Sequence, residues 1–224
     1  MKTLRSSMLC LGALLLTASV LPGQDFSKYR GFSLGMSLTT VLQRTEQKPA
    51  DVKLAHGRPL LLQELNWWPP NSSGTPSRSN SVEQMFFSFC NGELYKISVT
   101  YDHSSTEGLT AGDMVKSISA EYGPATSINA DVTPPTNEPY TQKQKPVASW
   151  EDSQSSFNLV RSAFTDRFGL IIFSKRINTE AELAVAAAVK LEEQEGPQRE
   201  AQRQKKEADD LEATRRKNQK AFRP

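Results

Sequence analysis

The sequence predicts an α+β protein made of two tandem repeats, each a short helix followed by an antiparallel meander, with a polar helical tail at the C-terminus. Two amphipathic helix patterns, each followed by segments in which apolar and polar residues alternate, indicate the repeats. After Arg176 apolar residues become scarce and Glu, Lys, Arg, Gln and Ala dominate, which indicates the tail. The expected ranges are 24–105 and 106–176 for the repeats and 177–224 for the tail.

The first 23 residues are typical of a secretory signal peptide. Lys2 and Arg5 precede an apolar run of 13 residues that starts at Met8, and a cleavage site follows at Gly23, with a cut after Ser19 as the alternative. The apolar run is too short to cross a bilayer as a helix, which takes roughly 20 residues. The sequence therefore predicts a periplasmic or secreted protein, cleaved after Gly23, without a membrane span.

Charge and cysteine content exclude several classes of function. The chain has 27 Lys plus Arg against 25 Asp plus Glu, and Lys2 and Arg5 leave with the signal peptide, so the mature chain is neutral and no general attraction to nucleic acid is expected. Cys90 becomes its only cysteine, so an internal disulfide cannot form. His56 and His103 lie far from Cys90 in the sequence, and there is no phosphate-binding glycine loop. We predict no metal ion and no cofactor.

The first repeat begins with a helix for which Ser37 is the predicted N-cap, because a serine oxygen can accept a hydrogen bond from a free amide of the first turn. The predicted inward side of this helix comprises Val41, Leu42 and Thr45. Three strands are expected after it, over residues 60–68, 84–89 and 94–101. Residues 69–80 are rich in Pro, Ser, Gly and Asn and predict a long surface loop.

Asn91-Gly92 predicts the turn of a hairpin between the second and third of these strands. In the third strand, Tyr95 and every second residue after it are apolar or aromatic, so this set is expected to be buried. A three-residue loop with a glycine bulge would place Met85, Phe87 and Phe89 on the same face. A two-residue loop would place those three among the polar residues, so hydrophobic agreement favours the three-residue loop.

The second repeat has the same order of elements. Thr110 and Asp113 form a predicted capping box at the start of its helix, and Tyr122-Gly123-Pro124 is expected to stop it. The side chains expected to face inward are Met114, Val115 and Ile118. Strands are expected over residues 147–151, 157–164 and 170–175, after a proline-rich loop at 133–146.

The tail is expected to start a helix at Thr179, which can form a capping box with Glu182. Gly196-Pro197 is expected to interrupt this helix, and a second polar helix is expected from Gln198 to Lys220. The heptad seam of the second helix is too polar for a coiled coil, so a solvated or disordered tail is favoured over a spacer or an oligomerising helix. Basic residues from Arg215 onward could contact anionic lipid, nucleic acid or peptidoglycan, but the acidic residues before them are expected to neutralise much of that attraction.

A short helix that opens on Gly35-Met36-Ser37, followed by a meander that carries Trp67 and Trp68 or Trp150, resembles the small outer-membrane-assembly lipoprotein domain (BamE, or SmpA/OmlA). Two such units in tandem, over roughly residues 29–175, resemble the beta-lactamase-inhibitor-protein architecture. The resemblance implies a noncatalytic binding role in the cell envelope, with a protein partner. The lipobox cysteine of the first family and the paired disulfides of the second are absent from this chain, so the resemblance does not extend to lipid anchoring or to inhibitor activity.

The predicted partner-binding residues are aromatic: Trp67, Trp68 and Trp150. Because adjacent residues of a strand face opposite ways, Trp67 and Trp68 cannot both fill the core, and one of them is expected at the surface unless another element covers it. Asp102-His103-Ser104 is the cluster that suggests catalysis, and a secreted hydrolase is the alternative function. These residue types after a strand are typical of an exposed turn, so we predict no catalytic residue and binding through the surface of the sheet.

Overall fold

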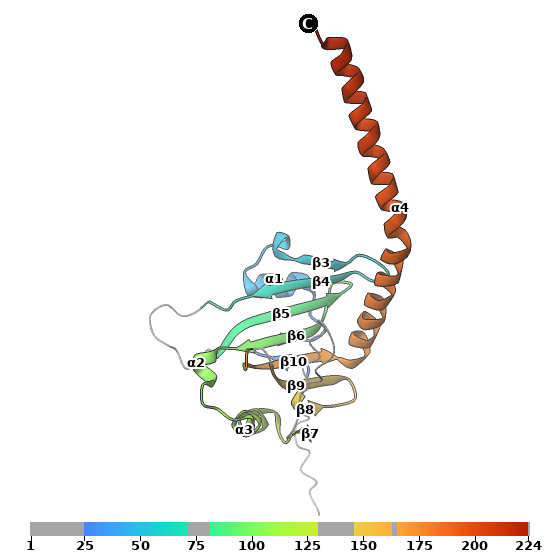
Figure 1. The fold of residues 1–224 in the computed structure, drawn as a ribbon. Coiled ribbons are helices and arrows are strands. Elements are labelled where there is room, and N and C mark those ends of the chain that lie inside the picture. The colour runs from blue at the N-terminus through green and yellow to red at the C-terminus, as the bar shows by residue number, and fades with distance from the viewer. Residues whose placement is uncertain (1–24, 71–80, 130–145, 163–164, 224) are drawn as a thin grey trace, which may run out of the picture.

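The computed structural model describes residues 25–70, 81–129, 146–162 and 165–223. The predicted signal peptide and most of the two predicted loops lie outside these ranges. A large antiparallel sheet of eight strands forms the body of the described chain, and a long helix extends from it at the C-terminus (Figure 1). The mixed fold class and the C-terminal helix agree with the prediction from sequence.

The strands of the sheet lie in the order β3-β4-β5-β6-β10-β9-β8-β7, so that β6 and β10 are its central neighbours. Their bounds are Lys53–His56 (β3), Leu62–Trp67 (β4), Val82–Cys90 (β5), Glu93–Tyr101 (β6), Ser127–Ile128 (β7), Pro146–Glu151 (β8), Ser155–Arg161 (β9) and Phe168–Ser174 (β10). The sequence predicted all of these except the two outer strands. Of those two, β3 has a shift in register between Leu54 and His56, and β7 has only two residues.

The remaining elements flank this sheet. They are the small hairpin β1 (Lys28–Tyr29) and β2 (Phe32–Ser33), the helices α1 (Leu38–Thr45), α2 (His103–Thr106), α3 (Ala111–Tyr122) and α4 (Lys175–Ala221), and a 3-10 turn at Pro49–Asp51. The sequence did not predict the hairpin, because each of its strands has two residues and shows no periodicity.

The predicted N-caps of α1 and α3 are confirmed, whereas that of the C-terminal helix is not. At the start of α1 the Ser37 hydroxyl accepts a hydrogen bond from the amide of Thr40 at 3.2 Å. At the start of α3 the Thr110 hydroxyl accepts from the amide of Asp113 at 3.2 Å, and the Asp113 carboxylate accepts from the amide of Thr110 at 2.9 Å. The buried residues of both helices lie on the predicted sides. The local signals therefore located both helices correctly.

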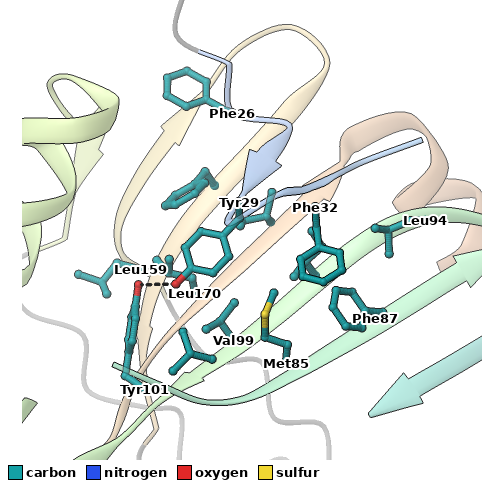
Figure 2. Close-up of a cluster of buried hydrophobic side chains, with 14 of the residues drawn as sticks. Phe26, Tyr29, Phe32, Met85, Phe87, Leu94, Val99, Tyr101, Leu159 and Leu170 are labelled. Atoms are coloured by element: carbon teal, nitrogen blue, oxygen red, sulfur yellow. Dashed lines mark hydrogen bonds between the residues drawn. The ribbon is translucent and has the colours of Figure 1, made fainter. Parts of the chain in front are cut away.

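One face of the sheet, the core face, packs against α1, α3 and the N-terminal hairpin. Figure 2 shows that Phe26, Tyr29 and Phe32 of the hairpin segment lie over side chains that the central strands contribute. The Tyr29 hydroxyl donates to the Tyr101 hydroxyl across 3.4 Å in this cluster (Figure 2). The hairpin segment thus closes the core that both halves of the sheet share.

The central pair of strands, β6 and β10, joins the two halves of the sheet. Leu170 lies opposite Val99, and Ile172 lies opposite Ile97, so large apolar side chains face each other across the joint. At Gly169 the two backbones are so close that an added Cβ would lie 2.5 Å from the Val99 carbonyl oxygen. A larger residue there would push the strands apart, so the joint requires glycine.

The turn between β5 and β6 corrects one prediction. Asn91 and Gly92, with φ of 51° and 79°, form a two-residue turn in place of the predicted three-residue loop. Turns with two positive φ angles have the twist that suits a hairpin. The extra residue lies beyond the turn at Tyr95, where the register shifts, so Leu94 enters the core and Tyr95 faces the other side of the sheet.

Helix α4 is unbroken over 47 residues, whereas two helices were predicted. It begins at Lys175, and Thr179 is not its N-cap, because the Thr179 hydroxyl donates to the carbonyl of Lys175 within the helix. Pro197 lies inside the helix and cannot donate a hydrogen bond to the carbonyl of Glu193. Strong helix formers on both sides offset this loss, and Figure 1 shows the helix changing direction along its length.

The first part of α4, Lys175–Glu195, packs on the sheet and is termed the docked part. Ile177 and Ala181 form a small cluster with Leu62 and Cys90 on the face opposite the core. This finding corrects the expectation of a solvated tail from residue 177, which arose because alanines on a helix indicate helix propensity but not burial.

Contacts of α4 with the body continue for four more turns. The buried stripe proceeds through Ala184 and Ala188, and the Glu195 carboxylate pairs with the Arg58 guanidinium at 3.0 Å. From Pro197 to Arg223 every side chain is exposed, and this segment is termed the free arm. The transition from body to tail therefore lies near Gly196 and not near Ile177.

Replacing Ala181 by glutamate should release the docked part, because Ala181 is only 1% exposed and a buried carboxylate without a partner is costly. Cys90 lies beneath the helix, and burial raises the pKa of its thiol. Its reaction with a thiol reagent should therefore accelerate at least about tenfold, which corresponds to about 1.4 kcal/mol in the opening equilibrium. Ala186→Glu makes the same change on the exposed side of the helix. Equal labelling of the two variants would contradict the docking.

Candidate functional site

The face of the sheet opposite the core is the candidate site. The helices α1 and α3 pack on the core face, whereas α4 packs on the opposite face near one end of its strands (Figure 1). The part of this face beyond α4 is termed the open face. A row of side chains crosses it with one residue from each of six strands: Asn66, Phe86, Ser98, Ile171, Asn158 and Ser149.

None of the six residues in this central row carries a charge, and five of them are partly exposed. Phe86 and Ile171 place apolar surface between the polar side chains. Hydrogen bonds hold the amides: Gln84 Nε2 donates to Asn66 Oδ1 at 3.3 Å, and Ser149 Oγ donates to Asn158 Oδ1 at 2.7 Å. Amides held in this way lose little conformational entropy when a ligand contacts them.

Charged side chains lie in the next row, on the side toward α4. Glu64 and Lys96 project from the sheet there, and the Lys175 ammonium pairs with the Glu151 carboxylate at 2.6 Å. Tyr95 packs partly buried against the docked part of the helix. The open face therefore has an uncharged centre with charged side chains along its side toward α4, and polar residues at the edge are common in protein interfaces.

The structure separates the three predicted tryptophans. Trp67 belongs to the core face, where its ring meets that of Phe32 edge-on at 5.7 Å. Trp68 directly follows β4 and is 59% exposed. Continued strand alternation from Asn66 places Trp68 on the side of the open face. The two neighbours thus point opposite ways, as strand geometry requires.

Trp150 is a core residue and leaves no surface for a partner in the folded protein. Its side chain is 0% exposed, and its Nε1 donates to the carbonyl of Gly123 at 2.8 Å. The alternation of residues in β8 does not show that Trp150 is buried, because its burial depends on the placement of β9 and of the end of α3. Trp150 links β8 to the end of α3.

The sequence reasoning selected tryptophans and missed Phe86, Ser98 and Ile171. The alternation that buries Ile97 and Val99 also assigns Ser98 to the opposite face. Uncharged residues at one aligned position in each of six neighbouring strands are the signal that could have found the central row of the open face.

Asp102 and His103 are arranged for capping a helix. The Asp102 carboxylate accepts from the amide of Ser105 at 3.0 Å and from the hydroxyls of Ser104 and Ser105 at the start of α2. The hydrogen bond from the Ser104 hydroxyl contributes most to lowering the pKa of Asp102, and the hydrogen bonds from Ser105 lower it further. The predicted exposed turn is a one-turn helix, and the contacts of Asp102 do not orient His103 as a base.

Two further properties bear on function. Within the described ranges, no helix is long and apolar enough to cross a membrane. In the same part of the chain, no three His, Cys, Asp or Glu side chains are grouped so that they could hold a metal ion.

A shallow hollow of about 340 Å³ lies between the N-terminal hairpin and the end of α3. Tyr29 and Tyr122 line it, and Tyr101 lies behind Tyr29. Burial raises the pKa of Tyr122 to about 12 and raises those of Tyr29 and Tyr101 as well. These tyrosines tie the hairpin and α3 to the core.

Replacing Trp150 by alanine should lower the free energy of unfolding by about 3–5 kcal/mol, because the change leaves a large cavity in the core. Trp68→Ala should change it by less than about 0.5 kcal/mol, because Trp68 is exposed. Urea unfolding of the two variants measures both values. Similar losses in the two variants would contradict the assignment of Trp150 to the core.

Stability should fall as the pH rises above about 10. The raised pKa values of Tyr29, Tyr101 and Tyr122 mean that the folded protein holds these protons more tightly than the unfolded chain, whose tyrosines titrate near 10. The stabilisation is complete below that pH and is lost as the pH rises through the folded-state values. Urea midpoints at about pH 8 and pH 11 test this, and Tyr122→Phe should show a smaller loss. Identical midpoints at both pH values would refute it.

Comparison of the chain with models of protein families, with curated proteins and with solved structures finds no match. Its function is therefore inferred from the open face.

Proposed function

We propose that this chain is an exported, noncatalytic protein of the cell envelope that binds a protein partner on the open face of its sheet. The observation that carries the proposal is the uncharged central row across six strands, on a face that α4 borders. Depletion of charge together with exposed aromatic and apolar groups is typical of the centre of protein interfaces. The signal-peptide pattern at the N-terminus supports export.

The proposal includes a tandem-repeat origin for the body. Its support is the order of the elements: α1 precedes β3 to β6, α3 precedes β7 to β10, and the two sets of strands meet in mirrored order at the β6–β10 joint. Ser37 and Thr110 begin the two helices in the same manner. This order agrees with the resemblance to paired BamE-like domains and to the beta-lactamase-inhibitor-protein architecture, both of which imply binding without catalysis.

Trp68 and α4 lie at opposite ends of the open face. Trp68 follows β4 at the end away from Leu62, which the docked part of α4 covers. A partner that contacts the central row would therefore lie between an exposed aromatic ring and the side of a helix. Aromatic side chains contribute more than most residues to interface affinity, so Trp68 is proposed as an anchor at this end.

A spacer role for the C-terminal helix is a second candidate, and the length of the free arm favours it. The arm exposes all its side chains, and its large apolar residues in the described range are Leu211 and Phe222. Two such residues bury too little apolar surface for a stable coiled coil. The arm is therefore proposed as an extension of the body and not as its means of self-association.

Ser98→Arg should weaken binding at the open face, because it places an unpaired cation at the centre of the uncharged row. The mature chain is cross-linked to cell-envelope proteins, the captured protein is purified, and its Kd is measured against each variant. We expect Ser98→Arg to weaken binding at least about 30-fold, which is about 2 kcal/mol at a central interface position. Trp68→Ala should weaken it less.

Ser117→Arg is the matched control, since Ser117 is exposed on α3, which packs on the other face of the sheet. It should leave the Kd unchanged. A captured protein that binds wild type and Ser98→Arg equally well would refute the open face as the site. Urea unfolding of each variant confirms that the sheet is intact.

A further inference from the structure

The charges of the free arm are segregated along its axis. Acidic side chains end at Glu212, and residues 213–223 contain five cations and no carboxylate side chain. The five are Arg215, Arg216, Lys217, Lys220 and Arg223, and all are exposed. Among the described residues, Arg216 is the member of this set that forms an ion pair, with Glu212 at 2.7 Å. The segment from Arg215 to Arg223 is termed the basic tip.

The helical geometry keeps the acidic residues from neutralising the basic tip. A rise of about 1.5 Å per residue places Lys217 about 8 Å and Lys220 about 12 Å along the axis from Glu212, the last acidic residue. Electrostatic interactions between exposed charges are screened over about 8 Å at physiological ionic strength. The expectation from sequence that the preceding acids cancel the basic stretch therefore holds for Arg216 but not for the end of the helix.

The basic tip also carries an exposed aromatic side chain. Phe222, the residue that follows the last helical turn, is 73% exposed and stands next to Arg223. Successive residues of a helix are about 100° apart, so the four of these cations that lie within α4 cover roughly half of its circumference. The tip is thus positive on several sides with an apolar group at its end. A partner that complements this arrangement has a flat anionic surface into which an aromatic ring can insert.

We infer that the basic tip binds the surface of a bilayer that contains anionic phospholipids. Each Lys or Arg near such a surface strengthens binding by about fivefold, and aromatic side chains favour the interfacial region of bilayers. Phe222 distinguishes this partner from a nucleic-acid duplex, whose stacked bases leave its phosphate groups to engage the cations alone. The inference is independent of the function proposed for the open face.

Binding through the tip would set the distance of the sheet from the membrane. The free arm from Pro197 to Ala221 spans about 35 Å at the helical rise. The ion pairs within the arm, such as Arg203 with Glu200 at 2.9 Å and Arg216 with Glu212, support its helix in water. The arm would therefore hold the open face away from the lipid surface, where a protein partner can reach it.

The test is co-sedimentation of the mature chain, residues 24–224, with vesicles of phosphatidylcholine alone or with about one third phosphatidylglycerol. The tip variant R215Q/K217Q/K220Q, which leaves the paired Arg216 in place, should bind the anionic vesicles about 100-fold more weakly than wild type, from about fivefold for each cation. The control R199Q/R203Q/K205Q removes the same net charge from the base of the arm and should bind within about fivefold of wild type. Circular dichroism checks that both variants keep the helix.

Phe222→Ser should weaken binding to anionic vesicles without changing the charge. Equal losses for the tip and control variants would overturn the inference, because net charge alone would then explain binding. Equal binding to neutral and anionic vesicles, no binding to either, or tighter binding to a duplex oligonucleotide than to vesicles would also overturn it. Ser98→Arg should bind vesicles like wild type, so a failure of the open-face proposal is distinguishable from a failure here.

Discussion

The pairing of β10 with β6 is the contact on which the rest of the structure depends. It makes one eight-stranded sheet from strands that come from the two ends of the body, and the core under the N-terminal hairpin spans both sides of it. The close approach at Gly169 leaves no space for a Cβ. Without this joint neither the shared core nor the row of side chains across six strands would exist.

The same strands serve two purposes because their side chains alternate. In β6, Ile97 and Val99 are packed in the core, while Ser98 between them lies on the open face. Large apolar side chains on the core face fix the position of each strand. Side chains on the other face can therefore vary in chemistry at little cost in stability, and this face also receives the docked part of α4 through alanines.

The sequence predicted the elements whose signals are local. The N-caps Ser37 and Thr110 and the alternating strands depend on neighbouring residues, and the structure contains them. What it could not predict depends on contacts between distant residues. The hairpin β1–β2 is held by packing on the sheet, the bulge at Tyr95 depends on which face α4 covers, and Trp150 is buried by the end of α3.

The open face escaped prediction for a related reason. Its central row consists of residues from six strands that become neighbours only when the order and register of the strands are known. The three tryptophans were predicted to bind a partner because aromatic residues are enriched in interfaces, yet of the three only Trp68 is largely exposed. The chemistry of a sheet surface is a property of the assembled sheet, so a motif search along the chain does not detect it.

The two outer strands of the sheet have a consequence for behaviour at high concentration. A long, regular outer strand presents unpaired amides and carbonyls that another molecule can extend into a continuous ribbon. Here β3 is short, carries Lys53 and is interrupted by its register shift, and β7 offers two residues. Neither border gives a second molecule enough regular backbone to template edge-to-edge aggregation.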